Sequence, residues 1–202
     1  MGEKAAVGKA VRTKGGRGIS VSVLAVIACF GAVACGKTST AAQQTGCETF
    51  AAGSTCIAFA PNFSGYTKWQ AYDVTDMNLQ NVVHTDATLT AYINKVPPKG
   101  STEFPVGTII VKSAVGGSTP ANNRVFAGVK RGGDFNANGS LNWEWFELLN
   151  TEQETPTIGW RGVGPPSSAD VYGGDPALCN GCHQQAKAND FIWADKLQLS
   201  NF

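Results

Sequence analysis

The run Thr-Ile-Ile-Val-Lys at residues 108–112 decides the fold of this chain. β-Branched side chains favour an extended backbone, so the run predicts a short strand. Arg124–Lys130 and Leu141–Leu149 follow with alternating apolar positions, and glycine-rich breaks separate the three segments. The spacing therefore predicts neighbouring strands of an antiparallel sheet.

The strand expected at Leu141–Leu149 has two different faces, because side chains alternate along a strand. One face would carry Trp143, Trp145 and Glu147, and the other Glu144, Phe146 and Leu148.

Short helices complete the predicted fold. Two are expected before the sheet, at about Tyr66–Tyr72 and at about Ala87–Lys95. Asp86 would be the N-cap of the second helix, and Pro97-Pro98 would end it. Residues 151–177 are rich in glycine and proline and are expected to form a long loop. The predicted class is α+β, mainly an antiparallel sheet with a few short helices.

The N-terminus predicts export. Residues 1–18 are basic, and residues 19–34 form an almost uncharged apolar run, shorter than the roughly 20 residues that a spanning helix needs. This pattern is typical of a cleaved signal peptide over residues 1–34 and predicts a periplasmic location. Residues 35–60 would be a tether and a disulfide-stapled segment, and residues 61–202 would be the functional domain.

A lipid anchor is expected on Cys35, which follows a small residue and precedes a polar stretch. Cys29 is a second candidate, and ordinary cleavage after Ala34 is the alternative. Such a lipid would be the only link to a membrane. Without residues 1–34 the chain carries a formal charge of about −3, and no basic patch indicates a nucleic-acid partner.

Cys47 and Cys56 are expected to form a disulfide, because export places the chain in an oxidising compartment. The bond would staple a stretch of small residues with little core-forming sequence around it. Unpaired thiols are the alternative.

The motif Cys179-Asn180-Gly181-Cys182-His183 predicts one covalently attached haem c. Two thiols one helical turn apart reach both vinyl groups of a porphyrin, and the adjacent histidine then meets the iron. Cys179 and Cys182 would hold the cofactor, and His183 would be the metal ligand. A thiol-exchange motif would need a thioredoxin-like setting, and zinc would need two further ligands when His84 is the only other histidine.

The haem motif is expected near the start of a short C-terminal helix. Asp175 is placed as its N-cap, followed by Pro176 at the first helical position. The helix would run from Pro176 to about Ala188.

The order of landmarks from Tyr66 to Phe202 resembles the cytochrome P-460 family, whose relatives include the β-type cytochromes c′. The resemblance covers about two thirds of the chain. The matching segments are Tyr66–Trp69, Phe104–Lys112, Asn142–Phe146, the CxxCH motif and Asn189–Trp193.

This resemblance implies a five-coordinate haem c on an antiparallel sheet, often in a homodimer, that oxidises hydroxylamine or binds nitric oxide. In the enzymes a strand lysine is joined to a porphyrin meso carbon, and Lys112 matches it. Lys112 shares a strand face with Thr108 and Ile110, so burial of that face would lower its pKa from about 10.4 and leave a nucleophilic amine. A strand-end lysine that reaches water is the alternative.

The chain departs from this pattern on the distal side. The enzymes carry an arginine where His84 is the best match, and His84 can donate a hydrogen bond, shuttle protons or bind iron. A half-buried histidine bonded to Asp86 or to the backbone is the alternative. The enzymes' pocket glutamate would fall near Phe126 or Ala127, where no acid stands. That loss favours gas binding, because hydroxylamine oxidation releases protons that need an acceptor.

Three functions therefore remain open: hydroxylamine oxidation with Lys112 and His84 as catalytic candidates, nitric-oxide binding without turnover, and electron transfer. An electron carrier would need a sixth iron ligand, for which His84 and Met77 are the candidates. The partners expected are a small nitrogen compound, a redox partner cytochrome and a second copy of the chain.

Overall fold

The computed structural model describes residue 47 and residues 54–75, 87–168 and 171–202. The predicted signal peptide, both candidate lipidation sites and most of the predicted tether lie outside these residues. So do Met77 and His84. Within the described part of the chain, no helix is long and apolar enough to cross a membrane.

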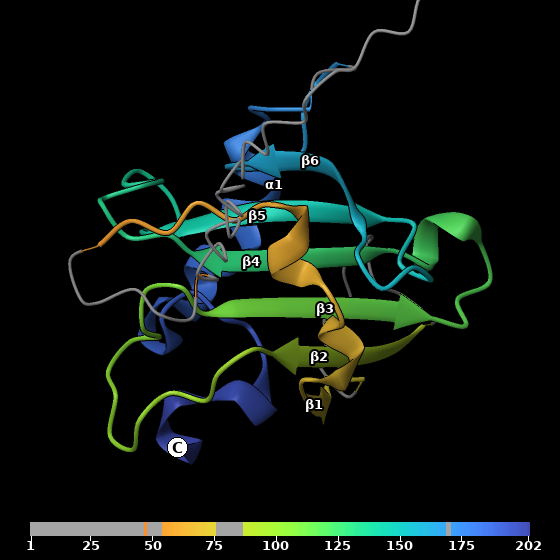
Figure 1. The fold of residues 1–202 in the computed structure, drawn as a ribbon. Coiled ribbons are helices and arrows are strands. Elements are labelled where there is room, and N and C mark those ends of the chain that lie inside the picture. The colour runs from red at the N-terminus through yellow and green to blue at the C-terminus, as the bar shows by residue number, and fades with distance from the viewer. Residues whose placement is uncertain (1–46, 48–53, 76–86, 169–170) are drawn as a thin grey trace, which may run out of the picture. The chain divides into compact units, whose positions relative to one another are not determined.

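Six antiparallel strands form one sheet in which spatial order equals chain order (Figure 1). The strands are β1 Gln70–Asp73, β2 Thr88–Ile93, β3 Ile109–Val115, β4 Val125–Lys130, β5 Trp143–Leu149 and β6 Thr157–Gly162. The predicted α+β class, mainly antiparallel sheet with few short helices, is confirmed. The three strands predicted around the Thr-Ile-Ile-Val-Lys run are confirmed as β3, β4 and β5.

The predicted helix at Ala87–Lys95 is wrong, because this segment contains strand β2. Leu89, Ala91 and Ile93 are buried in alternation, which is the period of a strand. Every residue of β2 pairs with β3. Hydrogen bonds to the neighbouring strand therefore satisfy the backbone N–H and C=O groups that a helix would satisfy internally.

The predicted helix at Tyr66–Tyr72 is only partly confirmed. The 3-10 helix η3, Tyr66–Lys68, occupies its first turn, and strand β1 occupies the rest. Gly65 enters the turn with φ 63°, a left-handed conformation that glycine adopts without a Cβ clash. Pairing of β1 with β2 then extends the chain.

The predicted loop at 151–177 is also partly wrong, because it contains strand β6. Trp160 and Gly162 of this strand are buried, and β6 pairs with β5 through a register shift. The glycines of this segment indicated a loop, so the strand was not predicted from the sequence. A Cβ on Gly162 would lie 2.3 Å from the carbonyl oxygen of Gly173, so close backbone approach requires glycine there.

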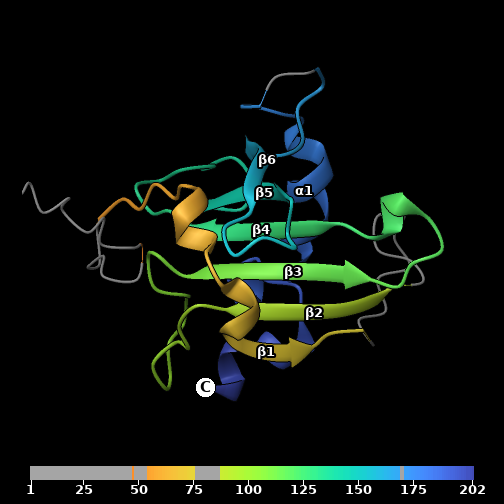
Figure 2. The same cartoon turned by 45° about the vertical axis from the view of Figure 1, so that its right-hand side comes forward.

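The sheet has an apolar cluster on each face. On one face, residues from β3, β4 and β5 pack against Cys47, Cys56, Phe63 and Tyr66 from the segments before the sheet. On the other face, Trp143, Trp145, Trp160 and Ile110 pack against the C-terminal segment with Ile192 and Leu197. Figures 1 and 2 show these two layers. Helix α1, Pro176–His183, lies on the face of the sheet that the C-terminal segment covers. The two faces predicted for β5 are confirmed.

A buried ion pair ties the first face to the segment before the sheet. The carboxylate of Glu144 is fully buried and accepts hydrogen bonds from Arg161 Nε at 2.7 Å and Nη2 at 2.8 Å. Arg161 also donates to the carbonyl oxygen of Ala58. Because the guanidinium has a planar fork of donors, it satisfies both partners at once.

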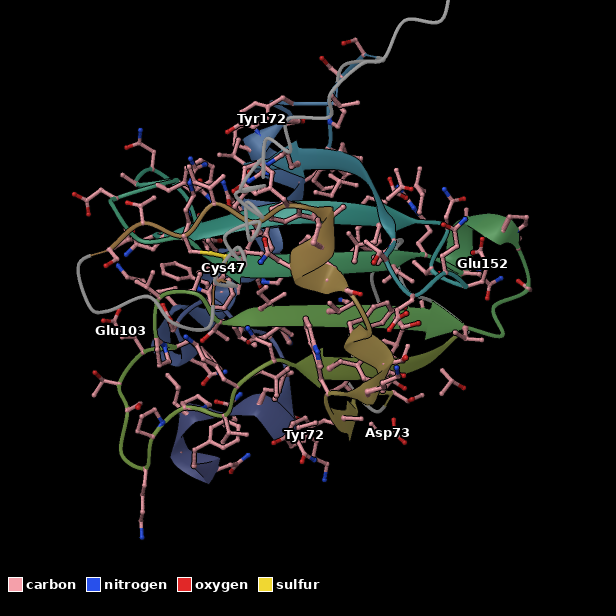
Figure 3. The ribbon with its side chains drawn as sticks, in the orientation of Figure 1. Cys47, Tyr72, Asp73, Glu103, Glu152 and Tyr172 are labelled. Carbon is pink, nitrogen blue, oxygen red and sulfur yellow. A yellow bond between two sulfur atoms is a disulfide. The ribbon has the colours of Figure 1, made fainter. Side chains whose placement is uncertain are left out.

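The predicted disulfide between Cys47 and Cys56 is confirmed, and Figure 3 shows its yellow bond at Cys47. The two Cα atoms lie 5.5 Å apart, and both side chains are buried. The backbone N–H of Cys56 donates to the carbonyl oxygen of Arg131 at 2.9 Å. The disulfide therefore fastens the incoming chain to the end of β4.

Replacing Cys47 and Cys56 together by alanine should lower the free energy of unfolding by about 2–3 kcal/mol, because the unfolded chain regains the entropy of the closed loop. Urea unfolding of the variant and of the wild type measures the loss. Wild-type protein unfolded with a reductant is the control and should match the variant. Equal stability of oxidised and reduced wild type would contradict the prediction.

Candidate functional site

A cavity of about 360 Å³ lies between the second face of the sheet and the C-terminal segment. Its lining is mostly apolar and includes Ile110, Phe126, Trp145, Trp160, Ile192 and Trp193. Lys112, Cys179, Cys182 and His183 line the same cavity. The structure thus brings together every predicted site residue except His84, which lies outside the described residues.

Strand register puts Lys112 in the middle of the sheet wall. Lys112 pairs with Ala91 on β2 and with Phe126 on β4, so these residues form one cross-strand row. Glu147 and Trp160 extend that row across β5 and β6. Because paired residues point to the same face of a sheet, all five belong to the cavity side.

Helix α1 supplies the opposite wall. Its N-cap is Asp175, whose Oδ1 accepts the backbone N–H of Ala177 at 2.8 Å, and Pro176 follows at the first helical position. The helix predicted from Pro176 to about Ala188 is confirmed in its first part, where it carries the whole CxxCH motif. It continues as the 3-10 helix η5, Gln184–Asn189.

His183 is held as a neutral imidazole with one nitrogen available. Its Nδ1 lies 2.7 Å from the carbonyl oxygen of Phe191, and a carbonyl only accepts, so Nδ1 carries the proton. Burial, with a smaller effect of the Lys112 ammonium, lowers the pKa of His183 to about 4. The unprotonated Nε2 can therefore act as a metal ligand at neutral pH.

Lys112 is partly accessible, and it lines the cavity. Desolvation lowers the pKa of Lys112 to about 8, although the thiols of Cys179 and Cys182 oppose the shift. A lowered pKa is expected for an amine that lies on an apolar face of a strand. About a tenth of this amine is therefore uncharged at pH 7.

The thiol of Cys179 is poorly suited to thiol exchange. Burial raises the pKa of Cys179 to about 12, so this sulfur remains a thiol at neutral pH. Within the described residues the only disulfide joins Cys47 and Cys56. In the same part of the chain, no group of three or more His, Cys, Asp or Glu side chains is arranged to hold a metal, as zinc would require.

Asn180, inside the motif, anchors α1 to the sheet. Its buried Oδ1 accepts from Asn136 Nδ2 at 2.9 Å, from the Ser140 N–H at 3.2 Å and from Trp145 Nε1 at 3.2 Å. Trp145 in turn packs against His183, with 4.1 Å between the ring centroids and 35° between the ring planes. The anchoring role of Asn180 was not predicted from the sequence, because the CxxCH motif leaves its two inner positions unspecified.

Gly128 makes room for that arrangement. It lies next to Trp145 across the β4–β5 pair, and a Cβ there would come 2.8 Å from the indole ring. The lack of a side chain on Gly128 allows the indole to lie flat against the strand.

Arg124 and Glu147 form a charged pair at one end of the cavity. Nε and Nη2 of Arg124 both lie 2.7 Å from Oε1 of Glu147, and Arg124 lines the cavity. Both residues also line a surface hollow next to it. Arg124 was not a predicted site residue. Glu147 lies on the cavity face of β5 and pairs with Phe126 across the β4–β5 ladder.

Asn180→Ala should lower the free energy of unfolding by about 3 kcal/mol, because two buried donors, the Ser140 N–H and Trp145 Nε1, lose their acceptor. Asn180→Asp keeps the accepting oxygen but loses the Nδ2 group that donates to Asn136 Oδ1 at 3.0 Å, so it should cost less than Asn180→Ala without matching wild type. Gln184→Ala, at an exposed residue just after the helix, is the control and should stay within about 0.5 kcal/mol of wild type. Urea unfolding measures all three, and equal losses for Asn180→Ala and Gln184→Ala would contradict the anchoring role.

Comparison of the chain with known protein families, with curated proteins and with solved structures found no match.

Proposed function

We propose that this chain is an exported monohaem c-type cytochrome of P-460 type that oxidises hydroxylamine or a related small nitrogen compound. One observation carries the proposal: the two thiols and the imidazole of a CxxCH motif line the same apolar cavity as a desolvated strand lysine. These are the groups that covalent attachment and iron ligation require.

The chemistry of the cavity fits a haem. Its lining is largely aromatic and aliphatic, as the flat apolar body of a porphyrin needs. His183 already has its Nδ1–H engaged by a backbone carbonyl, the usual outer-sphere arrangement of a ligating histidine. Cys179 and Cys182 would form the thioethers, and His183 would be the axial ligand. When bound, the haem would supply the redox chemistry and an open coordination position.

The P-460 type is proposed from the resemblance of segments and is supported by the position of Lys112. This residue stands on the sheet wall, opposite the helix that carries the thiols. A largely desolvated amine there is a competent nucleophile toward a porphyrin edge.

Glu147 and Arg124 favour turnover over simple gas binding. Oxidation of hydroxylamine releases protons, and Glu147 is paired with Arg124, which lines both the cavity and the surface hollow that Glu147 borders. Arg124 holds the Glu147 carboxylate in place through two short contacts. In this proposal the Glu147 carboxylate accepts the protons that leave the cavity past Arg124.

A nitric-oxide-binding protein is the second candidate, since an apolar cavity with one axial histidine also suits a small gas. Electron transfer is less well supported. Among the described residues that line the cavity, His183 is the only histidine and there is no methionine. A carrier normally fills both axial positions.

A periplasmic location, a lipid anchor on Cys35 or Cys29, a redox partner cytochrome and a homodimer belong to the same proposal. They follow from the N-terminal pattern and from the resemblance.

Production of the full chain with a haem-attachment machinery should yield coloured protein whose intact mass equals the processed polypeptide plus one haem. Cys179→Ala/Cys182→Ala should lose the covalently bound haem, because no thioether can form. Cys47→Ala/Cys56→Ala is the matched control and should keep it. A colourless wild type with alkylatable Cys179 and Cys182 would overturn the proposal.

The same mass measurement reports on Lys112. A bond between its Nζ and a porphyrin meso carbon replaces one hydrogen on each atom. This two-electron oxidation would use an added oxidant such as a peroxide, so the mass should fall by the two hydrogens lost relative to two thioethers alone. A strongly red-shifted ferrous absorption band should accompany the loss. An ordinary six-coordinate cytochrome c spectrum would contradict the P-460 type.

Glu147→Gln should lower kcat for hydroxylamine oxidation by about 10²-fold, since it removes the base but keeps the shape of the side chain. The haem spectrum should stay unchanged. Glu152→Gln is the control, because Glu152 is exposed in the β5–β6 connection (Figure 3). Unchanged turnover in Glu147→Gln would contradict the proton-acceptor role, and absence of turnover in the haem-loaded wild type would favour the nitric-oxide-binding alternative.

A further inference from the structure

A second buried ion pair lies next to the residue whose carbonyl group holds His183. Nζ of Lys130 lies 2.6 Å from Oδ1 and 2.8 Å from Oδ2 of Asp190. Both side chains are buried, with 2% and 7% of their surface exposed. Lys130 is the last residue of β4, and Asp190 directly precedes Phe191. The pair therefore joins the sheet to the segment that contacts the imidazole.

The backbone of this segment is held in an unfavourable conformation. Asp190 has φ 50° and Phe191 has φ 66°, so two consecutive residues with side chains are left-handed. The left-handed region is unfavourable for a residue with a Cβ, and the conformation persists only where its surroundings impose it. The left-handed turn aims the Phe191 carbonyl oxygen at His183 Nδ1.

Backbone hydrogen bonds hold part of this turn, such as the one from the Phe191 N–H to the Ala186 carbonyl oxygen at 3.0 Å, and the Asp190 carboxylate ties it to the sheet. Besides the Lys130 ammonium, its Oδ2 accepts the backbone N–H of Phe104 at 2.9 Å. Glu103, on the exposed side of the same loop, lies 3.6 Å from Lys130 Nζ and is largely screened by water (Figure 3). The buried Lys130–Asp190 pair is expected to contribute little to the stability of the fold, because desolvation offsets much of the attraction between buried charges.

We propose that Lys130 and Asp190 are positioning residues that hold the Phe191 carbonyl group against His183 Nδ1 and thereby raise the basicity of the axial imidazole. This inference rests on the proposed function, since it concerns the iron ligand. A firm hydrogen bond from Nδ1–H increases electron donation from Nε2. A more basic axial ligand stabilises the oxidised metal and lowers the reduction potential. Lys130 and Asp190 would thus set the potential without touching the cofactor.

Two substitutions in the haem-loaded full chain separate positioning from a plain effect of charge. Lys130→Met removes a positive charge, which by itself would lower the potential or leave it unchanged once Asp190 takes up a proton. Protonation is expected there, because burial already raises the pKa of Asp190 and the opposing ammonium is gone. Asp190→Asn removes a negative charge, which by itself would raise the potential.

Positioning predicts the same sign for both variants. Each should raise the reduction potential and shift the ferrous iron–histidine stretching band to lower frequency, because each frees the Phe191 carbonyl. Lys130→Arg keeps the cation and should return both values toward wild type. Glu144→Gln is the matched control, since it breaks a comparably buried ion pair on the opposite face of the sheet and should leave both values unchanged.

The outcomes are distinct. A higher potential and a lowered stretching frequency in Lys130→Met support the inference, and Lys130→Met carries the test even where Asp190→Asn fails to accumulate. A lower or unchanged potential in Lys130→Met overturns it, as does an equal shift in Glu144→Gln. A wild-type chain that binds no haem refutes the proposed function instead, so the two failures cannot be confused.

Discussion

One amide oxygen fixes the geometry of the cavity. Asn180 Oδ1 accepts from three donors of the β4–β5 connection and of β5, and these bonds tie the helix with the two cysteines to the sheet. The same contact orients Trp145, which packs against His183. The strand lysine and the two helical thiols therefore line one cavity because a polar contact joins the helix to the sheet.

Charged groups in this fold are sorted by face and by position. Glu144 and Arg161 neutralise each other on the side that receives the N-terminal segment. On the cavity side, Arg124 and Glu147 occupy one end, while Lys130 and Asp190 stand behind the histidine. Among the described residues that line the cavity, Lys112 is the only lysine. The paired charges thus lie around the cavity, and its lining stays mostly apolar. An apolar lining has a low effective dielectric constant, which strengthens electrostatic interactions inside the cavity.

The sequence predicted the elements whose formation depends mainly on residues close together in the chain. β-Branched and alternating residues indicated β3, β4 and β5, and a proline after an aspartate indicated α1. Strand β2 was predicted as a helix. Its alternation of buried and accessible residues is explained only by its pairing with β3, which the local sequence does not show. Strand β6 was hidden by glycines whose need arises from distant backbone. In the site, the motif and Lys112 were found, whereas Asn180, Arg124 and the Lys130–Asp190 pair depend on partners up to 60 residues away in the chain.

The thiol of Cys179 also bears on how such a protein matures. A sulfur that ionises only at about pH 12 is almost never a thiolate in the folded chain at neutral pH. If thioethers form on this motif, bond formation is fastest while helix and sheet are still apart and water reaches the sulfur. Chain closure would then seal the product. On this route, covalent attachment would come before the final packing of the helix against the sheet.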